Sequence, residues 1–163
     1  MESFNESIIE YKKQMEKGII QKAYRGIMDY VMQLRTYFLN NYPEYMVSNL
    51  YYGYMDMTYF PISVKKLKDR KLKIAIVFLH DKCQFEAWLS GSNRKVQKKY
   101  SEIISDYDWN KYRIDPKNAD SIIECTLDAN PDFSNTIVLT KKIEESTISF
   151  IKDIELFFSQ HKK

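Results

Sequence analysis

Two consecutive apolar segments joined by a very short turn constrain the fold of this chain more than any other feature. The segments cover residues 72–80 and 83–90, with residues 81–82 between them. This spacing predicts a β-hairpin, and a two-residue loop fixes which residues face one another. Phe78 then lies opposite Phe85, and the pairing continues along both strands. Each side chain of the hairpin can therefore be assigned to one of two faces.

One face of the predicted hairpin is uniformly apolar, and the other is mixed. The opposed pairs on the apolar face are Phe78 with Phe85, Ile76 with Ala87, and Ile74 with Leu89. The pairs on the mixed face are Val77 with Glu86, Ala75 with Trp88, and Lys73 with Ser90. An antiparallel sheet can bury one face and leave the other in water. We therefore expect the apolar face to form the core under helices.

Residues 51–60 are interpreted as a further strand, ended by Pro61. Two methionines alternate there with Tyr54 and Asp56, and burial of the methionines places Tyr54 and Asp56 on the mixed face. We therefore expect a ligand-binding face formed by four residues: Tyr54, Asp56, Glu86 and Trp88. The alternative is a face that is half-solvated or covered by the last helix.

Helices are predicted on both sides of these strands. Ser3 and Glu6 form a possible capping box for a short helix up to Lys17, with Ile8, Tyr11 and Met15 directed inward. A longer helix follows over residues 19–41, another begins at residues 91–93, and a last one is capped by Ser134. Short strands are predicted at residues 112–114 and 121–127. The predicted order is α-α-β-β-β-α-β-α. This is a single compact α+β domain over residues 1–163, with a mostly antiparallel sheet packed by long N- and C-terminal helices.

The long helix over residues 19–41 carries an apolar stripe with spacings of four and three. Its members are Ile20, Tyr24, Ile27, Val31, Leu34 and Phe38. We expect this stripe to pack on the protein's own sheet, because a coiled coil needs more sustained heptads. The alternative is pairing with a second chain, so the protein is expected to be a monomer or a homodimer.

Basic residues cluster on both sides of the hairpin although the net charge is only +3. Both clusters belong to the open end of the hairpin and are expected to be neighbours in space. The residues predicted to bind an anion are Lys65, Lys66, Lys68, Arg70, Lys71, Arg94 and Lys98. Such a patch could bind phosphate or nucleic acid. The alternative is ordinary solvated charge.

Other features bound the class of protein. Cys83 and Cys125 are the two cysteines, which is too few for a disulfide framework. The first residues are polar and unlike a signal peptide, and no apolar run approaches the ~20 residues that span a bilayer. We expect a cytoplasmic protein with reduced thiols and no membrane association.

The predicted order of elements contains the core order of the PD-(D/E)XK nuclease-like fold. That family places an Asp on the second core strand and an acidic-x-Lys triplet on the third. Here only Glu86 matches, because Trp88 stands at the Lys position and residues 72–79 contain no Asp. His80 and Cys83 have no further ligands to complete a metal site. We therefore expect no catalytic residues, no metal and no cofactor.

Three segments resemble a family of small bacterial and archaeal proteins that is defined only as a domain of unknown function. They are YGYMDMTYF at residues 52–60, KLKIAIVF at residues 71–78 and FEAWLSG at residues 85–91. The resemblance implies a compact α+β domain from a prokaryote and transfers no activity. We predict a non-enzymatic module that binds an unknown small molecule or protein through one sheet face. The alternative is a catalytically degenerate relative of the nuclease-like fold that binds nucleic acid or acts as a metal-dependent phosphodiesterase.

Overall fold

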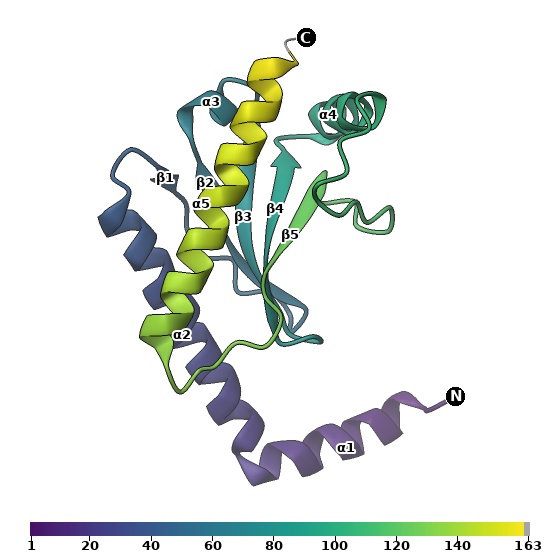
Figure 1. The fold of residues 1–163 in the computed structure, drawn as a ribbon. Helices are drawn as coiled ribbons and strands as arrows, with labels where there is room; N and C mark the ends of the chain where they lie inside the picture. The colour runs from purple at the N-terminus through teal and green to yellow at the C-terminus, as the bar shows by residue number, and fades with distance from the viewer. Residues whose placement is uncertain (162–163) are drawn as a thin grey trace.

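The computed structural model describes residues 1–161, which form an α+β fold around one antiparallel sheet (Figure 1). The strands follow one another in the sheet in chain order: β1 (Met46–Val47), β2 (Met57–Ser63), β3 (Leu72–Leu79), β4 (Gln84–Gly91) and β5 (Ile123–Asp128). The helices are α1 (Phe4–Lys17), α2 (Ile19–Asn41), α3 (Lys65–Lys68), α4 (Arg94–Asp106) and α5 (Thr136–Gln160). The predicted fold class is confirmed. The last two residues of the predicted domain, 162–163, lie outside the described residues.

The β3–β4 hairpin has the predicted register. Phe78 pairs with Phe85, Val77 pairs with Glu86, and the pairing continues to Leu72 and Gly91. The turn is longer than predicted, because β3 ends at residue 79 and β4 begins at residue 84. The two faces of the hairpin are therefore those that the sequence indicated.

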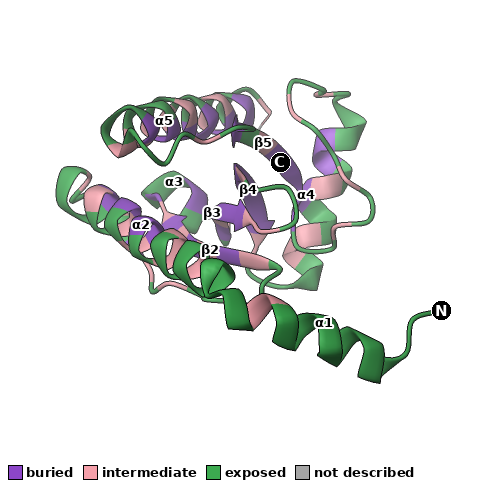
Figure 2. Ribbon diagram, turned by 90° about the horizontal axis from the view of Figure 1, so that it is seen from below, coloured by how far each residue is buried: buried purple, intermediate pink, exposed green. Residues whose placement is uncertain are grey.

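Helices α2 and α5 cover the apolar face of the sheet and close the main core (Figures 1 and 2). The side chains that are almost completely buried there include Leu34 and Phe38 from α2 and Phe150 and Phe158 from α5, packed with Phe60, Phe78 and Phe85 from the sheet. Burial of one such side chain contributes about 1.5–3 kcal/mol. The last helix has the predicted apolar side, although its N-cap is Asn135 rather than Ser134.

The strand predicted over residues 51–60 is wrong in position and in orientation. Strand β2 begins at Met57 and passes through Pro61 to Ser63. Phe60 pairs with Ile76 on the core face, so Met57 and Tyr59 lie on the mixed face. The sheet tolerates Pro61 because its backbone faces β1, where its carbonyl accepts a hydrogen bond from the Ser48 N–H at 2.9 Å. The missing N–H of proline therefore removes no hydrogen bond to β3.

Residues 51–56 form a tight loop before β2 instead of a strand. Gly53 and Met55 both have positive φ, at 79° and 64°. The Asp56 carboxylate accepts a hydrogen bond from the Tyr54 N–H at 2.8 Å, and the Asp56 carbonyl accepts one from the His80 N–H at 3.0 Å. These bonds hold the loop against the β3–β4 turn.

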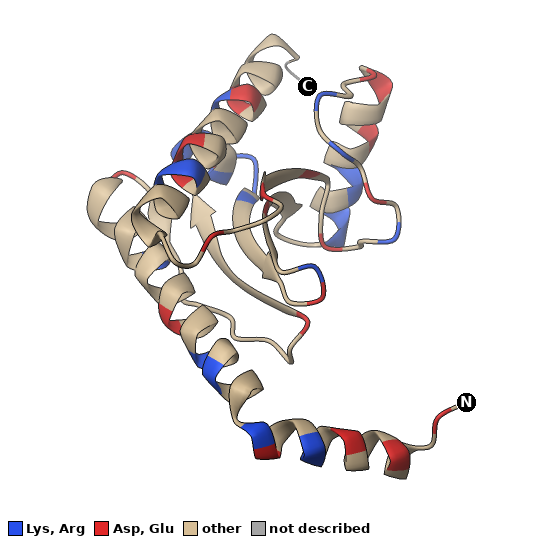
Figure 3. Ribbon diagram, turned by 60° about the horizontal axis from the view of Figure 1, so that its bottom comes forward, with Lys and Arg blue, Asp and Glu red and all other residues tan. Residues whose placement is uncertain are grey.

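Helix α1 projects from the domain and buries none of its residues (Figures 1 and 2). The prediction that Ile8, Tyr11 and Met15 point inward is therefore wrong. Gly18 ends α1 in the left-handed conformation, at φ 71°, and directs α1 away from the axis of α2. The first half of α1 carries Glu6 and Glu10, and its second half carries Lys12, Lys13, Glu16 and Lys17 (Figure 3).

The apolar stripe of α2 divides into two parts. Val31, Leu34 and Phe38 are buried in the domain's own core, as predicted. Ile20 is exposed, because the first half of α2 extends beyond the sheet toward α1. Among residues 1–161, no helix combines the length and the apolar character needed to cross a membrane.

The conformation of Gly53 gives a prediction about stability. A Cβ atom at Gly53 would lie 2.0 Å from the Met57 carbonyl oxygen, and φ is positive. We expect Gly53→Ala to lower the free energy of unfolding by about 2 kcal/mol or more. Gly26→Ala is the matched control, because nothing lies within 4 Å of its Cβ position in α2. It should stabilise the protein by about 0.5–1 kcal/mol. Urea unfolding of both variants measures this, and equal effects would contradict the described loop.

Candidate functional site

The mixed face of the sheet lies opposite α2 and α5. Strand register places on it Met57 and Tyr59 from β2, Lys73, Ala75 and Val77 from β3, Glu86, Trp88 and Ser90 from β4, and Glu124 and Thr126 from β5. Ala75, Val77 and Trp88 form a small apolar cluster there, separate from the main core. This face is divided into a closed polar part and an open part.

The segment over residues 107–122 wraps around the free edge of β5 and covers part of the mixed face. On the side of α5, the Trp109 ring stacks on Phe157 with centroids 4.3 Å apart, and the Tyr112 hydroxyl donates to Asp153. The backbone of Arg113 then pairs with Glu124 of β5. The predicted strand at residues 112–114 is reduced to this one bridge. The wrap carries the Arg113 side chain over the mixed face.

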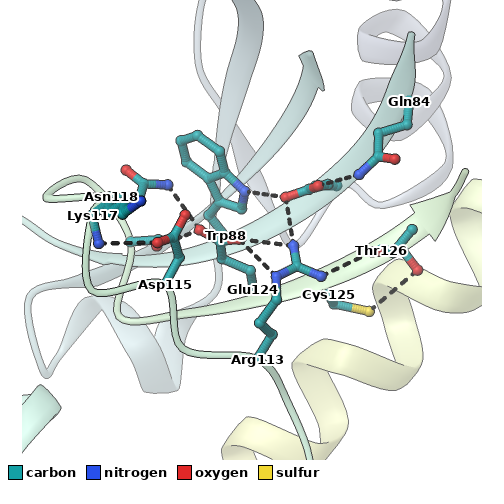
Figure 4. Close-up of polar contacts among 11 residues, drawn as sticks. Gln84, Trp88, Arg113, Asp115, Lys117, Asn118, Glu124, Cys125 and Thr126 are labelled. Carbon is teal, nitrogen blue, oxygen red and sulfur yellow. Dashed lines mark hydrogen bonds and ion pairs between the residues drawn. The ribbon is translucent and has the colours of Figure 1, made fainter. Parts of the chain in front are cut away.

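Arg113 connects two buried carboxylates (Figure 4). Its Nη2 atom lies 2.9 Å from Glu86 Oε1 and 2.8 Å from Glu124 Oε2. The Trp88 indole Nε1–H also donates to Glu86 Oε1, at 2.9 Å. Glu124 Oε1 accepts from Asn118 and from Ser121, each at 2.9 Å. We call these residues the Arg113 network.

The Arg113 network satisfies the charges that it buries. Glu86 is 1% exposed and Glu124 is 4% exposed, whereas the Arg113 side chain is 46% exposed. Burial works against the charge of Arg113, but hydrogen bonds and the charges of Glu124 and Glu86 outweigh it and raise the pKa of Arg113. The remaining Glu86 oxygen accepts from the Gln84 amide. Both oxygens of the Glu86 carboxylate therefore have partners within the protein, and the carboxylate is not accessible to a ligand.

An open cavity of about 440 Å³ lies beside this network on the mixed face. Trp88, Met57 and Ala75 contribute apolar surface to its lining. The rings of Tyr51 and Tyr59, whose centroids are 5.0 Å apart, also line it. The lining of the cavity therefore includes flat aromatic surface.

The same cavity has a polar lining that includes two cations. Lys73 lines it from β3, and Arg94 lines it from the first turn of α4. Within residues 1–161 neither forms an ion pair, although Arg94 donates to the Ala119 carbonyl at 3.0 Å. Asp120 supplies the one carboxylate among the cavity residues. The two cations are available to an anionic group.

The four residues predicted to form the binding face do not lie together. Glu86 and Trp88 are neighbours in the Arg113 network, as their register predicted. Tyr54 is 88% exposed in the loop before β2, so it lies outside the face. Asp56 is also exposed there, and backbone hydrogen bonds from Tyr54 and Met57 lower the pKa of its carboxyl. Both residues were misplaced because β2 begins at Met57 and turns its methionine to the mixed face.

The predicted basic patch is divided by the sheet. Lys66 lies 3.7 Å from Glu155 of α5. Arg70 donates to the Phe158 carbonyl of α5 at 3.2 Å, and its guanidinium lies over the Phe158 ring. Arg94 instead lines the cavity on the mixed face. Lys98 pairs with Glu102 along α4, while Lys65, Lys68 and Lys71 are exposed. Of the seven predicted anion-binding residues, Arg94 is the one that lines this cavity.

His80 and Cys83 have local roles at the β3–β4 turn. His80 Nε2 and Thr58 Oγ1 share a hydrogen bond of 2.8 Å, and the imidazole packs on Tyr24. Burial lowers the pKa of His80 below its ordinary value of 6.5. Among the described residues, no group of three or more His, Cys, Asp and Glu side chains is placed to hold a metal ion.

The sequence analysis did not identify four residues of this face: Arg113 and Glu124 of the network, and Tyr51 and Tyr59 of the cavity lining. Residues 107–122 have no periodicity, so nothing in the sequence indicates that Arg113 crosses the edge of β5. Extending the hairpin pairing to the next strand would place a residue of β5 beside Trp88. However, the register of β4 and β5 shifts between Phe85 and Glu86, and a shift of this kind has no signal in the sequence.

Comparison with known families gives one result. A family model described as "Domain of unknown function (DUF7000)" matches residues 4–158, and this agrees with the resemblance of the three segments. Comparison with curated proteins and with solved structures gives no match. The match assigns no activity and gives no support to a nuclease-like relationship.

The Arg113 network predicts that loss of Arg113 destabilises the protein more than loss of an exposed basic residue. Arg113→Met removes the cation between two buried carboxylates and should lower the free energy of unfolding by about 3 kcal/mol. This value is at the low end for a buried pair because Arg113 is half exposed. Arg113→Lys should lose less, since it retains the charge but not the geometry.

Lys111→Met is the matched control for these variants. Lys111 pairs with Asp153 at 2.9 Å, but its side chain is exposed, so its loss should cost less than about 1 kcal/mol. Chemical denaturation of the three variants ranks them. If Arg113→Met is no more harmful than Lys111→Met, the network does not support the fold.

Proposed function

We propose that this chain, which belongs to the DUF7000 family of domains of unknown function, is a non-enzymatic module that binds a small anionic ligand with a flat ring. The observation that carries the proposal is the open cavity on the mixed face, where aromatic surface and two cations, Lys73 and Arg94, converge. This proposal keeps the sheet face expected from the sequence but replaces most of its residues. Trp88 is the residue common to both.

The size and lining of the cavity support a small ligand rather than a polymer. A volume of about 440 Å³ lies within the range of about 300–1,000 Å³ that is typical of small-molecule sites. Tyr51 and Tyr59 offer ring faces on which a planar ring can stack, and the Trp88 indole, which is 7% exposed, lines the cavity beside them. The Arg113 network holds the Trp88 indole in one orientation, through the bond from its N–H to Glu86. A ring that stacks on the tyrosines thus lies beside an indole whose orientation is already fixed.

The charges around the cavity define the polar part of the ligand. Lys73 and the Arg94 guanidinium favour a phosphate or a carboxylate, and both are free of acidic partners among residues 1–161. Asp120 can accept hydrogen bonds from hydroxyl or amino groups. A nucleoside monophosphate combines a flat ring, a phosphate and such donors. We therefore take mononucleotides as the ligand class.

Binding without catalysis is favoured by what the cavity contains. Its lining residues include neither His nor Cys, and Asp120 is its one carboxylate. General acid–base chemistry usually needs two titratable groups at the reacting centre. The metal-dependent phosphodiesterase alternative has less support. Glu86, its one matching residue, is enclosed by Arg113, Trp88 and Gln84.

A cytoplasmic location fits this proposal. Cys83 and Cys125 are both free thiols, and Cys83 is exposed. Free, exposed thiols persist in a reducing compartment. Mononucleotides are also intracellular metabolites, so protein and proposed ligand would share that compartment.

Ligand binding can be tested through the fluorescence of Trp88. In a Trp109→Phe background, Trp88 is the remaining tryptophan. Titration with adenosine or uridine 5′-monophosphate, up to about 1 mM, should change its emission. The nucleosides alone and inorganic phosphate should bind more weakly, because each supplies half of the contacts.

Variants identify the site of any binding. Lys73→Met and Arg94→Met should each raise the Kd for the monophosphate about tenfold, since each removes one charge-assisted contact. Lys82→Met at the distant β3–β4 turn is the control and should leave the Kd unchanged. If no monophosphate alters the fluorescence, or if Lys82→Met weakens binding as much as the two cavity variants, the proposed site is wrong.

A further inference from the structure

The cavity on the mixed face has a carboxylate on the side opposite its two tyrosines. Tyr51 and Tyr59 line the cavity from the side of β2. Asp120 lines it from the far side, where the Asp120 carbonyl accepts a hydrogen bond from the Ser90 hydroxyl of β4. Strands β2 and β4 lie on either side of β3, so they are about 10 Å apart, which is two spacings between neighbouring strands. This width suits the ring and the sugar of one nucleotide.

The charge of Asp120 acts across the cavity on the tyrosine side. Burial raises the pKa of the Tyr59 hydroxyl, and the charges of Tyr51 and Asp120 raise this pKa further. Asp120 is distant from Tyr59 in the sequence, so the interaction reflects their proximity in space. The carboxylate and the aromatic surface therefore belong to the same site.

The backbone around Asp120 is fixed by neighbouring elements. The Asp120 N–H donates to the Asn118 side chain at 3.0 Å, and the Asn118 amide donates to Glu124 of β5 at 2.9 Å. The Ala119 carbonyl accepts a hydrogen bond from Arg94 of α4 at 3.0 Å. The position of Asp120 is therefore set by the fold before any ligand binds.

The Asp120 side chain remains available to a ligand. The hydrogen bonds of Asp120 involve its backbone, and within residues 1–161 its exposed carboxylate forms no ion pair. A carboxylate near Lys73 and Arg94 weakens their attraction for a simple anion. It adds affinity when the ligand also brings hydrogen-bond donors, because an ionised carboxylate is an acceptor alone. The lining thus favours a ligand with an anionic group and separate donor groups.

We infer that Asp120 binds the ribose hydroxyls of the ligand, so that the site selects ribonucleoside 5′-monophosphates over their 2′-deoxy counterparts; this inference rests on the proposed function. The ring then lies against Tyr51 and Tyr59. The 5′-phosphate meets Lys73 and Arg94, and the sugar between ring and phosphate directs its hydroxyls to Asp120. The two neighbouring hydroxyls of ribose offer two donors to one carboxylate, and an acidic residue binds the ribose 2′-hydroxyl in the same way in many dinucleotide sites.

The same carboxylate disfavours a phosphate on the sugar hydroxyls. A 3′-phosphate brings negative charge to Asp120 and removes one donor, so it is repelled where the 3′-hydroxyl is bound. The site therefore distinguishes the 5′-monophosphate from its 3′ isomer, although the two carry the same ring and the same charge.

Calorimetric titration of the full chain tests the role of Asp120. The wild type should bind adenosine 5′-monophosphate about tenfold more tightly than 2′-deoxyadenosine 5′-monophosphate, because the deoxy sugar lacks one hydrogen bond to a charged acceptor. Asp120→Ala should bind the two nucleotides with equal Kd. This variant should keep the fold, since the bonds of Asp120 to the rest of the domain are made by its backbone. Asp106→Ala is the matched control, because it removes the same charge at the end of α4, outside the cavity lining, and should keep the tenfold preference.

Adenosine 3′-monophosphate provides a second readout with the same variants. It should bind the wild type more weakly than the 5′ isomer, and Asp120→Ala should narrow this difference while Asp106→Ala leaves it unchanged. If neither 5′-monophosphate binds the wild type, the proposed function fails and the role of Asp120 fails with it. If both bind with equal Kd, or if the tenfold preference survives in Asp120→Ala, the cavity binds mononucleotides but Asp120 does not bind the ribose.

Discussion

The mixed face of the sheet depends on one interaction. The guanidinium of Arg113 forms ion pairs with the buried carboxylates of Glu86 and Glu124. A carboxylate at the centre of a sheet face normally needs water, and burial without a partner is costly. Here Arg113 supplies the charge, and Trp88, Gln84, Asn118 and Ser121 supply the remaining hydrogen bonds. The face can therefore close over its charged residues instead of remaining solvated.

The segment that closes the polar part of the mixed face also lines the open cavity. The segment that brings Arg113 across the edge of β5 continues to Asp120, which lines the cavity. Trp88 belongs to both parts, because its N–H is bound to Glu86 while its ring lines the cavity. The fold thus fixes an aromatic surface beside two cations, Lys73 and Arg94, which form no ion pair within residues 1–161. This is the physical basis for the proposal that the domain binds a small anion with a flat ring.

Much of the fold could be predicted from the sequence, because strong periodicity and a short turn leave few choices. The β3–β4 hairpin has the predicted pairs because any slip of one residue would bury Glu86 in the main core. Strand β2 was misplaced because Pro61 suggested the end of a strand. In the structure the Pro61 backbone faces β1, so its missing N–H removes no hydrogen bond to β3. Helix α1 has a periodic apolar sequence, but this periodicity does not indicate whether another element covers its apolar side. The Arg113 network could not be predicted, since it joins an irregular segment to a strand whose register contains a bulge.

The state of the Trp88 indole tests the central claim most directly. The chain has two tryptophans, and ¹H–¹⁵N spectra of the wild type and of Trp109→Phe assign their two indole signals. A buried N–H bound to a carboxylate should exchange slowly with solvent. The account predicts that the Trp88 signal is protected from exchange in the wild type and loses protection in Arg113→Met, while Trp109 keeps its behaviour. Fast exchange of the Trp88 indole in the wild type would contradict a closed network at this face.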